Sequence, residues 1–449
     1  MPPVLLLIFA FLLAGAQTGT SARAPPARAA PVQRAWQFNA SMLHTADVLV
    51  RARLAAASAQ RAGVVVSPDE LAYVAVHSVS VNWTAVALQA GQPQAPHART
   101  GVTCTITSGA LVPGATGISV SVSGTPGSTP TSPRTFLLSL PTTLATAGGS
   151  FPTLLVLHGG VQYAADFLSH TGFDTQGIAD GYIVLAPNGL PGVLGLGGTW
   201  PLLNQAGDGS GDAGAQDDRT FVADCLDCVN QLLQGLTPSA SLSGDVYAAG
   251  WSIGAKFAAR LACGGSANAP ALRSPYTVRA LALSAGLQAD PGSQCLNGGK
   301  PVPVVAFACP TDLIVPFCTS AVVVFGSAAY HATRPEFDLW RSSYNGAPSH
   351  MDETCSTDDT VALFSSGQGD STTALVWWPA SVTSAYGGHD WPMSLSGCGS
   401  ATAVSMRLFG NVRTGTSTPL CGSMSACGAS PPTPCSAVDA IWPYSGTNP

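Results

Sequence analysis

The sequence predicts an α/β protein whose core is a doubly wound, mostly parallel β-sheet with helices on both faces. Three observations lead to this prediction. Short apolar runs recur between residues 117 and 392, segments of helical length separate most of them, and one Gly-Xaa-Ser-Xaa-Gly turn joins such a run to a helical stretch. Strands that are buried on both faces of a parallel sheet have this uniformly apolar composition.

The first two predicted strands form an antiparallel pair that opens the sheet. Residues 118–122 alternate between apolar and polar side chains, which is typical of a half-buried strand. A turn-rich loop over residues 124–134 leads to the second strand at residues 135–140. The later strands are expected at residues 153–157, 182–186, 246–249, 278–284, 302–308 and 374–378.

One turn carries a signal for chemistry. The stretch Gly250–Gly254 reads Gly-Trp-Ser-Ile-Gly, follows the apolar run 245–249 and precedes the helical run 255–262. A sharp strand-turn-helix connection of this kind presents Ser252 as a nucleophile, and glycines stand where side chains would collide with the strand and the helix. The alternative is an ordinary Gly-Ser turn, so the assignment depends on finding a base and an acid.

Asp312 and His389 are the candidates for these two roles. A nucleophilic serine requires a base, and the base requires an acid that orients it; in the α/β-hydrolase plan they follow in the order Ser, Asp, His. Asp312 follows the predicted strand 302–308, and His389 follows strand 374–378 in a glycine-rich turn. Each residue alone is compatible with an ordinary turn or loop residue. Their order and their positions after strands together predict a triad with Ser252.

The predicted site also needs two backbone N–H groups that bind a developing oxyanion. We assign one to Ile253, directly after the nucleophile, and the other to Gly160, in the turn after strand 153–157. His158 in the same turn is interpreted as a residue that stabilises the turn rather than as a catalytic group.

Three tryptophans are candidate substrate contacts. Trp200 lies in the glycine-rich segment 188–218, which we expect to form the wall that receives the acyl group. Trp251 and Trp391 are assigned as further substrate contacts.

The composition excludes several classes of function and indicates export. Of the 449 residues, 46% are hydrophobic and only 9% are charged, and the formal net charge is −6. This provides a large core but no basic surface for nucleic acid or anionic lipid. Residues 4–13 are continuously apolar and are followed by Ala-Gly-Ala, the pattern of a cleavable signal peptide. A membrane anchor is the rejected alternative, because this run is shorter than the ~20 residues that span a bilayer.

These patterns divide the chain into three parts. Residues 1–16 are the signal peptide, residues 17–100 are an N-terminal extension of a linker and short helices, and residues 101–449 are the α/β domain. Within the last part, residues about 394–435 are expected to form a cysteine-rich insert. The Asn-Xaa-Ser/Thr sequences at Asn39 and Asn82 are glycosylation sites if the host is eukaryotic.

The twelve cysteines predict a disulfide-containing fold, because their number is even and export leads to an oxidising compartment. Cys225 and Cys228 have a spacing that also suits redox or metal chemistry. Because no second pair with zinc spacing is present, they are interpreted as two structural half-cystines. Cys263 and Cys295 flank the strand 278–284 and are candidate partners of each other or of near neighbours.

Four stretches are together typical of one family. They are His158–Gly160 (His-Gly-Gly), Gly250–Gly254, Thr311-Asp312 with Val315-Pro316, and Gly387–Pro392 (Gly-Gly-His-Asp-Trp-Pro), the most specific of the four. They resemble the feruloyl esterase and polyhydroxybutyrate depolymerase family of secreted α/β-hydrolases, over about residues 117–392. The resemblance implies hydrolysis of a carboxylic ester through Ser252, Asp312 and His389, without a metal or an organic cofactor.

The expected activity is that of a secreted esterase that removes feruloyl or acetyl groups from polysaccharide. A depolymerase of a hydroxyalkanoate polyester is the close alternative, because both reactions use the same triad. A non-catalytic binding protein with a hydrolase fold is a third hypothesis, and the presence of all three triad residues counts against it. The expected partner is the ester substrate, with no nucleic acid and no membrane span, and the sequence leaves the oligomeric state open.

Overall fold

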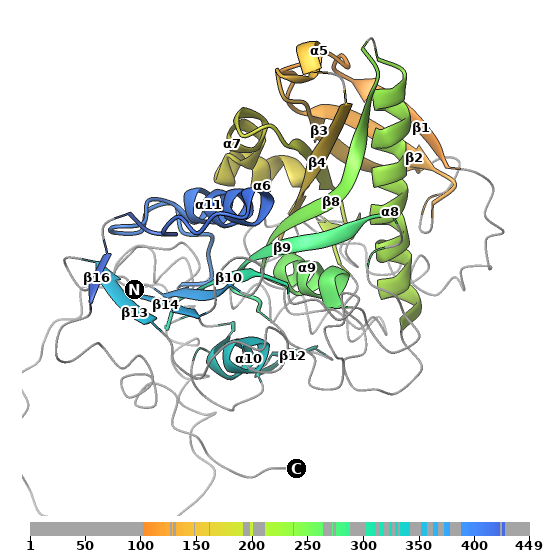
Figure 1. Ribbon diagram of the computed structural model, residues 1–449. Coiled ribbons are helices and arrows are strands. Elements are labelled where there is room, and N and C mark those ends of the chain that lie inside the picture. The colour runs from red at the N-terminus through yellow and green to blue at the C-terminus, as the bar shows by residue number, and fades with distance from the viewer. Residues whose placement is uncertain are drawn as a thin grey trace, which may run out of the picture. The chain divides into compact units, whose positions relative to one another are not determined.

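A 12-stranded β-sheet organises the described part of the chain (Figure 1). The signal peptide, the N-terminal extension, both glycosylation sequences and the chain after residue 426 lie outside the residues that the structure describes. In this computed structural model the described residues are 102–426 without 126–127, 129–131, 148, 161, 192–197, 201–211, 237, 264–271, 273–274, 288–301, 311, 313, 316, 318–322, 326–327, 331–332, 342–351, 357–361, 367–371, 378–387 and 423.

Six neighbouring strands form the parallel centre of the sheet, and every adjacent pair among them is parallel. In spatial order they are β5 (Ile183–Pro187), β4 (Gly149–Leu157), β8 (Ala240–Trp251), β9 (Thr277–Ser284), β10 (Val304–Ala308) and β15 (Thr373–Trp377). They correspond to the six apolar runs of the sequence, so the predicted α/β-hydrolase fold is confirmed. β4 and β8 begin several residues earlier than predicted, because the residues that extend them mix glycine and serine with apolar side chains and form no continuous apolar run.

Antiparallel strands complete the sheet at both ends. One end consists of β1 (Thr103–Ser108), β2 (Ile118–Ser123) and β3 (Arg134–Ser139), and the other of β14 (Ala362–Ser366), β13 (Asp352–Ser356) and β16 (Met424–Ala426). Only β2 and β3 were predicted. The other four strands have short, mixed or polar sequences, which do not distinguish an edge strand from a loop.

Helices cover both faces of the sheet (Figure 1). α8 (Asp212–Gln234) and α9 (Ile253–Cys263) pack on one face, and α6 (Ala164–Thr171), α7 (Phe173–Ala179) and α11 (Ala401–Thr414) pack on the other. None of the helices in the described ranges is long and apolar enough to cross a bilayer. The remaining elements are α5 (Leu144–Ala147), α10 (Thr333–Leu339), β6 (Leu190–Pro191), β7 (Gly198–Thr199), β11 (Val323–Phe325) and β12 (Ala328–Tyr330).

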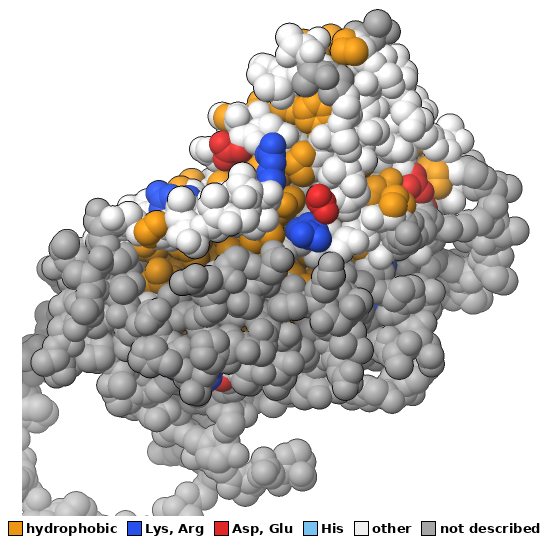
Figure 2. All heavy atoms as spheres, in the orientation of Figure 1, with side chains coloured by type: hydrophobic (Ala, Val, Ile, Leu, Met, Phe, Trp, Pro, Cys, Tyr) orange, Lys and Arg blue, Asp and Glu red, His pale blue; other side chains and the backbone are white. Residues whose placement is uncertain are grey.

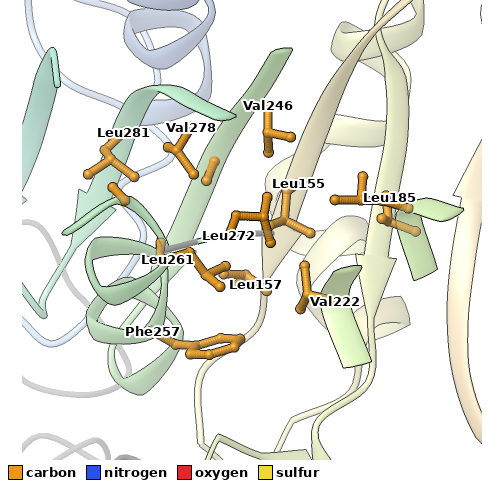
Figure 3. Close-up of a cluster of buried hydrophobic side chains, with 14 of the residues drawn as sticks. Leu155, Leu157, Leu185, Val222, Val246, Phe257, Leu261, Leu272, Val278 and Leu281 are labelled. Atoms are coloured by element: carbon orange, nitrogen blue, oxygen red, sulfur yellow. The ribbon is translucent and has the colours of Figure 1, made fainter. Parts of the chain in front are cut away.

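The core consists of two hydrophobic clusters separated by the sheet. Successive residues of a strand point to opposite faces, so Leu155 belongs to the cluster under α8 and α9 while Leu154 belongs to the cluster under α6, α7 and α11. In the first cluster, Val222 of α8 and Phe257 of α9 lie with Leu155 and Val246 of the central strands (Figure 3). Among the described residues on the face shown in Figure 2, charged side chains are few and of both signs, in agreement with the composition.

The predicted cysteine-rich segment 394–435 contains α11, a helix that the sequence analysis did not anticipate. The Ser400 side chain caps its N-terminus by accepting a hydrogen bond from the Ala403 amide, and Gly415 ends it in the left-handed conformation. Its apolar residues belong to the second core cluster. This segment therefore supplies part of the layer that covers the sheet.

Two disulfide bonds join distant parts of the described chain. Cys104 of β1 is bonded to Cys228 of α8, and Cys398 is bonded to Cys421 across α11. The prediction of a disulfide-containing fold is thereby confirmed. The proposed partner of Cys263 lies outside the described residues, so that pairing stays a prediction.

Cys225 corrects the prediction that both cysteines of the Cys-Xaa-Xaa-Cys stretch are half-cystines. Cys228 forms a disulfide, whereas Cys225 is a free thiol buried in the core. The two residues are one helical turn apart on α8, and only Cys228 reaches β1. Burial raises the pKa of the Cys225 thiol well above its usual value, and a buried thiol that stays protonated is chemically inert.

Candidate active site

Ser252 lies at the sharp turn between β8 and α9, with a backbone φ of 55°. Residues other than glycine rarely adopt this left-handed backbone conformation, and when they do it is often at strained functional turns. A Cβ atom on Gly250 would lie 2.4 Å from the carbonyl oxygen of Gly254, and one on Gly254 would lie 2.3 Å from that of His158. Only glycine fits at both positions, as predicted from the Gly-Xaa-Ser-Xaa-Gly pattern.

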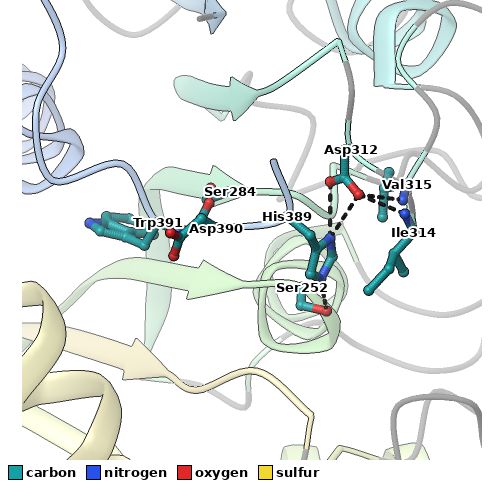
Figure 4. A network of polar contacts seen from close by, with 8 residues as sticks. All are labelled: Ser252, Ser284, Asp312, Ile314, Val315, His389, Asp390 and Trp391. Carbon is teal, nitrogen blue, oxygen red and sulfur yellow. Dashed lines mark hydrogen bonds and ion pairs between the residues drawn. The ribbon is translucent and has the colours of Figure 1, made fainter. Parts of the chain in front are cut away.

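The three predicted triad side chains meet in the structure (Figure 4). Nε2 of His389 is 2.8 Å from Oγ of Ser252, and Nδ1 is 2.9 Å and 3.1 Å from the two carboxylate oxygens of Asp312. Each of the three residues is 3% exposed. A carboxylate only accepts hydrogen bonds, so Nδ1 carries the proton and Nε2 offers its lone pair to the serine hydroxyl. This arrangement allows the imidazole to take a proton from Ser252.

Backbone amides hold the Asp312 carboxylate in place. Its Oδ1 atom accepts hydrogen bonds from the amides of Ile314, at 2.8 Å, and Val315, at 2.9 Å (Figure 4). Asp312 itself follows β10, as predicted, and its amide donates to the carbonyl of Cys309 at 3.0 Å. The carboxylate is therefore fixed by three separate contacts, of which His389 is one.

The loop that bears His389 approaches the acid turn closely. Gly388 has a φ of 102°, and a Cβ atom there would lie 2.7 Å from Sγ of Cys309. A side chain at position 388 would therefore be strained and would push His389 away from Asp312. The second glycine of the Gly-Gly-His stretch is thus required by the fold of the site.

The turn after β4 brings His158 beside the Ser252 turn, since a Cβ atom on Gly254 would lie 2.3 Å from the His158 carbonyl oxygen. His158 is fully buried; its Nε2 accepts a hydrogen bond from the Gly189 amide at 2.9 Å, so Nδ1 carries the proton and donates to the Gly159 carbonyl at 2.7 Å. Burial lowers the pKa of His158 from 6.5 to about 4, so the ring is neutral at pH 7. These contacts agree with the interpretation of His158 as a turn-stabilising residue.

The two predicted oxyanion donors differ in how the fold orients them. Ile253 is the first residue of α9, where an amide has no acceptor within its own helix. The Gly160 amide belongs to the peptide whose carbonyl is bonded to His158, and in a planar trans peptide the N–H points opposite to the C=O. The His158 ring therefore determines the direction of the Gly160 N–H group.

Trp200 and Trp391, which were predicted to contact substrate, both lie in the core. They are 0% and 1% exposed. The Trp200 indole donates to the His158 carbonyl at 2.8 Å, and the Trp391 indole donates to Oγ1 of Thr402 at 3.0 Å. Rings without exposed surface offer no face to a ligand, so the structure gives both a packing role. Trp251 is 7% exposed and its ring centroid is 5.5 Å from that of His389.

Ser284 is a polar residue beside the triad that the sequence analysis missed. Its hydroxyl donates to the carbonyl of Asp390 at 2.5 Å. A serine at the end of an apolar strand belongs to no recognisable motif, and the partner is 106 residues away in the chain. Among the described residues, no group of His, Cys, Asp and Glu side chains has the arrangement of a metal site.

Comparison with known proteins finds similarity to solved structures alone. No protein-family model and no curated protein matches the chain. An acetyl xylan esterase from Aspergillus awamori is 11% identical over 55% of this chain and 87% of its own, with a TM-score of 0.34. The protein sOPH is 14% identical over 76% of this chain and 94% of its own, with a TM-score of 0.38. An esterase from Thermogutta terrifontis is 13% identical over 41% of this chain and 70% of its own, with a TM-score of 0.28. At this level of similarity no activity is transferred to this chain.

Proposed function

We propose that the protein is a serine hydrolase of carboxylic esters, with Ser252 as nucleophile, His389 as general base and Asp312 as the residue that orients the imidazole. The proposal is carried by one observation, the continuous hydrogen-bonded series from Ser252 Oγ through His389 to Asp312. The strained φ of Ser252 adds support, because such strain is maintained at functional turns.

The proposed reaction has two halves. Ser252 Oγ attacks the ester carbonyl carbon while His389 Nε2 takes its proton, and the protonated imidazole is stabilised by the Asp312 carboxylate. His389 then gives this proton to the departing alcohol, which leaves an acyl-enzyme. In the second half His389 takes a proton from water, which attacks the acyl group, and then returns that proton to Ser252 Oγ as the acyl–oxygen bond breaks and the acid is released.

The Gly160 and Ile253 amides are the proposed donors to the oxyanion that forms in both halves. A donor of this kind is worth about 2.7 to 4 kcal/mol of transition-state stabilisation. The Gly160 amide is held ready by His158, and Ile253 by the first turn of α9. No reorganisation of these backbone groups is then needed when the negative charge develops.

The proposed substrates are feruloyl or acetyl esters of polysaccharide, and the proposed location is extracellular. Support for the location comes from the Cys104–Cys228 and Cys398–Cys421 disulfides, since such bonds persist in oxidising compartments. The substrate class rests on the resemblance of the motifs. Comparison of turnover on methyl ferulate, p-nitrophenyl acetate and a hydroxybutyrate oligomer separates this proposal from a polyester depolymerase.

The substitution Ser252→Ala tests the nucleophile. We expect kcat on p-nitrophenyl acetate to fall at least about 10³-fold, because the acyl-enzyme cannot form. The thermal unfolding midpoint should stay close to that of the wild type, since the change removes one hydroxyl. Turnover of both p-nitrophenyl acetate and methyl ferulate at the wild-type rate by the folded variant would exclude Ser252 as nucleophile.

A further inference from the structure

We propose that Ser284 is a positioning residue that holds the Ser252 turn and the His389 loop in register, an inference that rests on the proposed hydrolase function. Ser284 is the last residue of β9 and has no exposed surface. In the sheet it is paired with Trp251 of β8 on one side and Phe307 of β10 on the other. It therefore lies between the strands that lead to Ser252 and to Asp312.

Ser284 binds both catalytic segments through different atoms. Its backbone carbonyl accepts a hydrogen bond from the Ser252 amide at 2.9 Å. Its hydroxyl donates to the carbonyl of Asp390, the residue that follows His389, at 2.5 Å (Figure 4). A single buried residue is thus bonded to the backbone of the nucleophile turn and to the backbone of the histidine loop.

The chain after Ser284 is shaped to pass close beneath the nucleophile. Ala285 has a φ of 50° and, with Ser252, is one of the two non-glycine residues with positive φ in the described ranges. Its amide donates to the carbonyl of Phe307 at 3.0 Å. At the next position, a Cβ atom on Gly286 would lie 2.3 Å from the Ser252 carbonyl oxygen. The strained turn brings β9 into direct contact with the nucleophile turn, which favours a functional reason for its geometry.

The Ser284 hydroxyl binds the histidine loop at Asp390, the residue directly after His389. The Asp390 carbonyl is one peptide away from the His389 Cα atom, so a shift of that carbonyl moves the imidazole. On its other side the loop is held by the Asp390 side chain, whose Oδ1 atom accepts from the Trp391 amide at 2.8 Å and lies 3.5 Å from Nε2 of His170. Without the Ser284 hydroxyl the loop keeps its contact with α6 but loses this hydrogen bond to β9.

The expected consequence is a loss of alignment between His389 and Ser252. The two atoms that exchange the proton are 2.8 Å apart, and a misplacement of about 1 Å in a catalytic pair costs on the order of 100-fold in rate. Binding of the ester should change little, because Ser284 is enclosed and does not face the substrate. The signature of a positioning role is therefore a fall in kcat at nearly constant KM.

The test compares Ser284→Ala with the matched variant Ser405→Ala. Ser405 in α11 is also 0% exposed, and its hydroxyl also donates to a backbone carbonyl, that of Ala401 at 2.7 Å. We expect Ser284→Ala to lower kcat on p-nitrophenyl acetate about 10- to 100-fold with KM within three-fold of wild type. Ser405→Ala should keep kcat within two-fold, although both variants lose one buried hydrogen bond. A kcat within two-fold of wild type for Ser284→Ala, or an equal loss for both variants, would overturn the positioning role.

Phosphorylation of Ser252 by paraoxon separates this inference from the proposed function. Oγ of Ser252 attacks phosphorus, p-nitrophenolate leaves, and His389 accepts the serine proton, so the released p-nitrophenolate reports activation of Ser252 without ester turnover. A wild-type protein that neither hydrolyses esters nor reacts with paraoxon would end both proposals. A reactive wild type together with an equally reactive Ser284→Ala variant would end the positioning role alone, and a 10-fold slower reaction of that variant would support it.

Discussion

The imidazole of His158 donates a hydrogen bond to the carbonyl of Gly159 at 2.7 Å, and this bond sets the direction of the next amide in the chain. That amide belongs to Gly160, one of the two proposed oxyanion donors. The same ring accepts from the Gly189 amide through Nε2. The bond from Gly189 requires neutral imidazole, because protonation of Nε2 would place an N–H group against the Gly189 N–H group.

The stability of the protein should therefore depend on pH through His158. Its pKa is lowered from 6.5 to about 4 by burial, so the unfolded chain binds more protons between these values. As the pH falls from 6.5 to 4, the free energy of unfolding should decrease by about 3 kcal/mol more than in a protein without this imidazole. The measurement is the free energy of unfolding by urea at pH 7, 5.5 and 4 for wild type and His158→Asn, which does not titrate. The stability advantage of the wild type should shrink toward pH 4; a constant difference would contradict the prediction.

Asp312→Asn should impair catalysis through the tautomer of His389. The amide oxygen of asparagine would keep the bonds from Ile314 and Val315, which leaves its NH₂ group facing His389 Nδ1. Nδ1 must then accept, so the proton moves to Nε2, which can no longer take the proton of Ser252. We expect a loss of about 10³- to 10⁴-fold in kcat. The exposed Asp180→Asn is the control, and equal kcat values for the two variants would exclude this role.

Gly254→Ala should destabilise the fold severely. The new Cβ would lie 2.3 Å from the His158 oxygen and 2.4 Å from the Leu157 oxygen, and both are backbone atoms that cannot move aside. Gly410→Ala in α11 is the matched control, because no atom lies within 4 Å of its Cβ position. Alanine there should raise stability by up to about 1 kcal/mol. Thermal unfolding midpoints test both expectations, and a midpoint for Gly254→Ala equal to that of wild type would refute the first.

The two disulfides within the described residues should contribute unequally to stability. Cys104–Cys228 closes a separation of 124 residues, and Cys398–Cys421 closes one of 23. In the chain-entropy account, closing these loops in the unfolded chain stabilises the folded state by about 5 kcal/mol for the first disulfide and about 3 kcal/mol for the second. Urea unfolding of the Cys104→Ser/Cys228→Ser and Cys398→Ser/Cys421→Ser variants should show the larger loss for the first pair. The reverse order would indicate that strain or residual structure, rather than loop length, dominates.

The central strands and the positions of the triad residues could be predicted from the sequence because their signals are local. A strand buried on both faces has to be continuously apolar, as in β10, and a nucleophile turn has to carry glycines where backbone atoms approach, as at Gly250 and Gly254. Parallel strands also end at one edge of the sheet. Residues that follow different strands, such as Asp312 and His389, are therefore brought together by the fold class alone.

The remaining features depend on contacts between residues that are far apart in the chain. Nothing near Trp200 or Cys225 in the sequence shows that the indole is enclosed beside His158, or that the thiol faces the core while Cys228 faces β1. The bond from Ser284 to Asp390 spans 106 residues and exists only because β9 ends beneath the histidine loop. Local composition thus determined the central strands and the positions of Ser252, Asp312 and His389 after them. The packing of those segments decided which side chains are buried and which polar groups hold the site, because burial and hydrogen bonding are properties of neighbours in space.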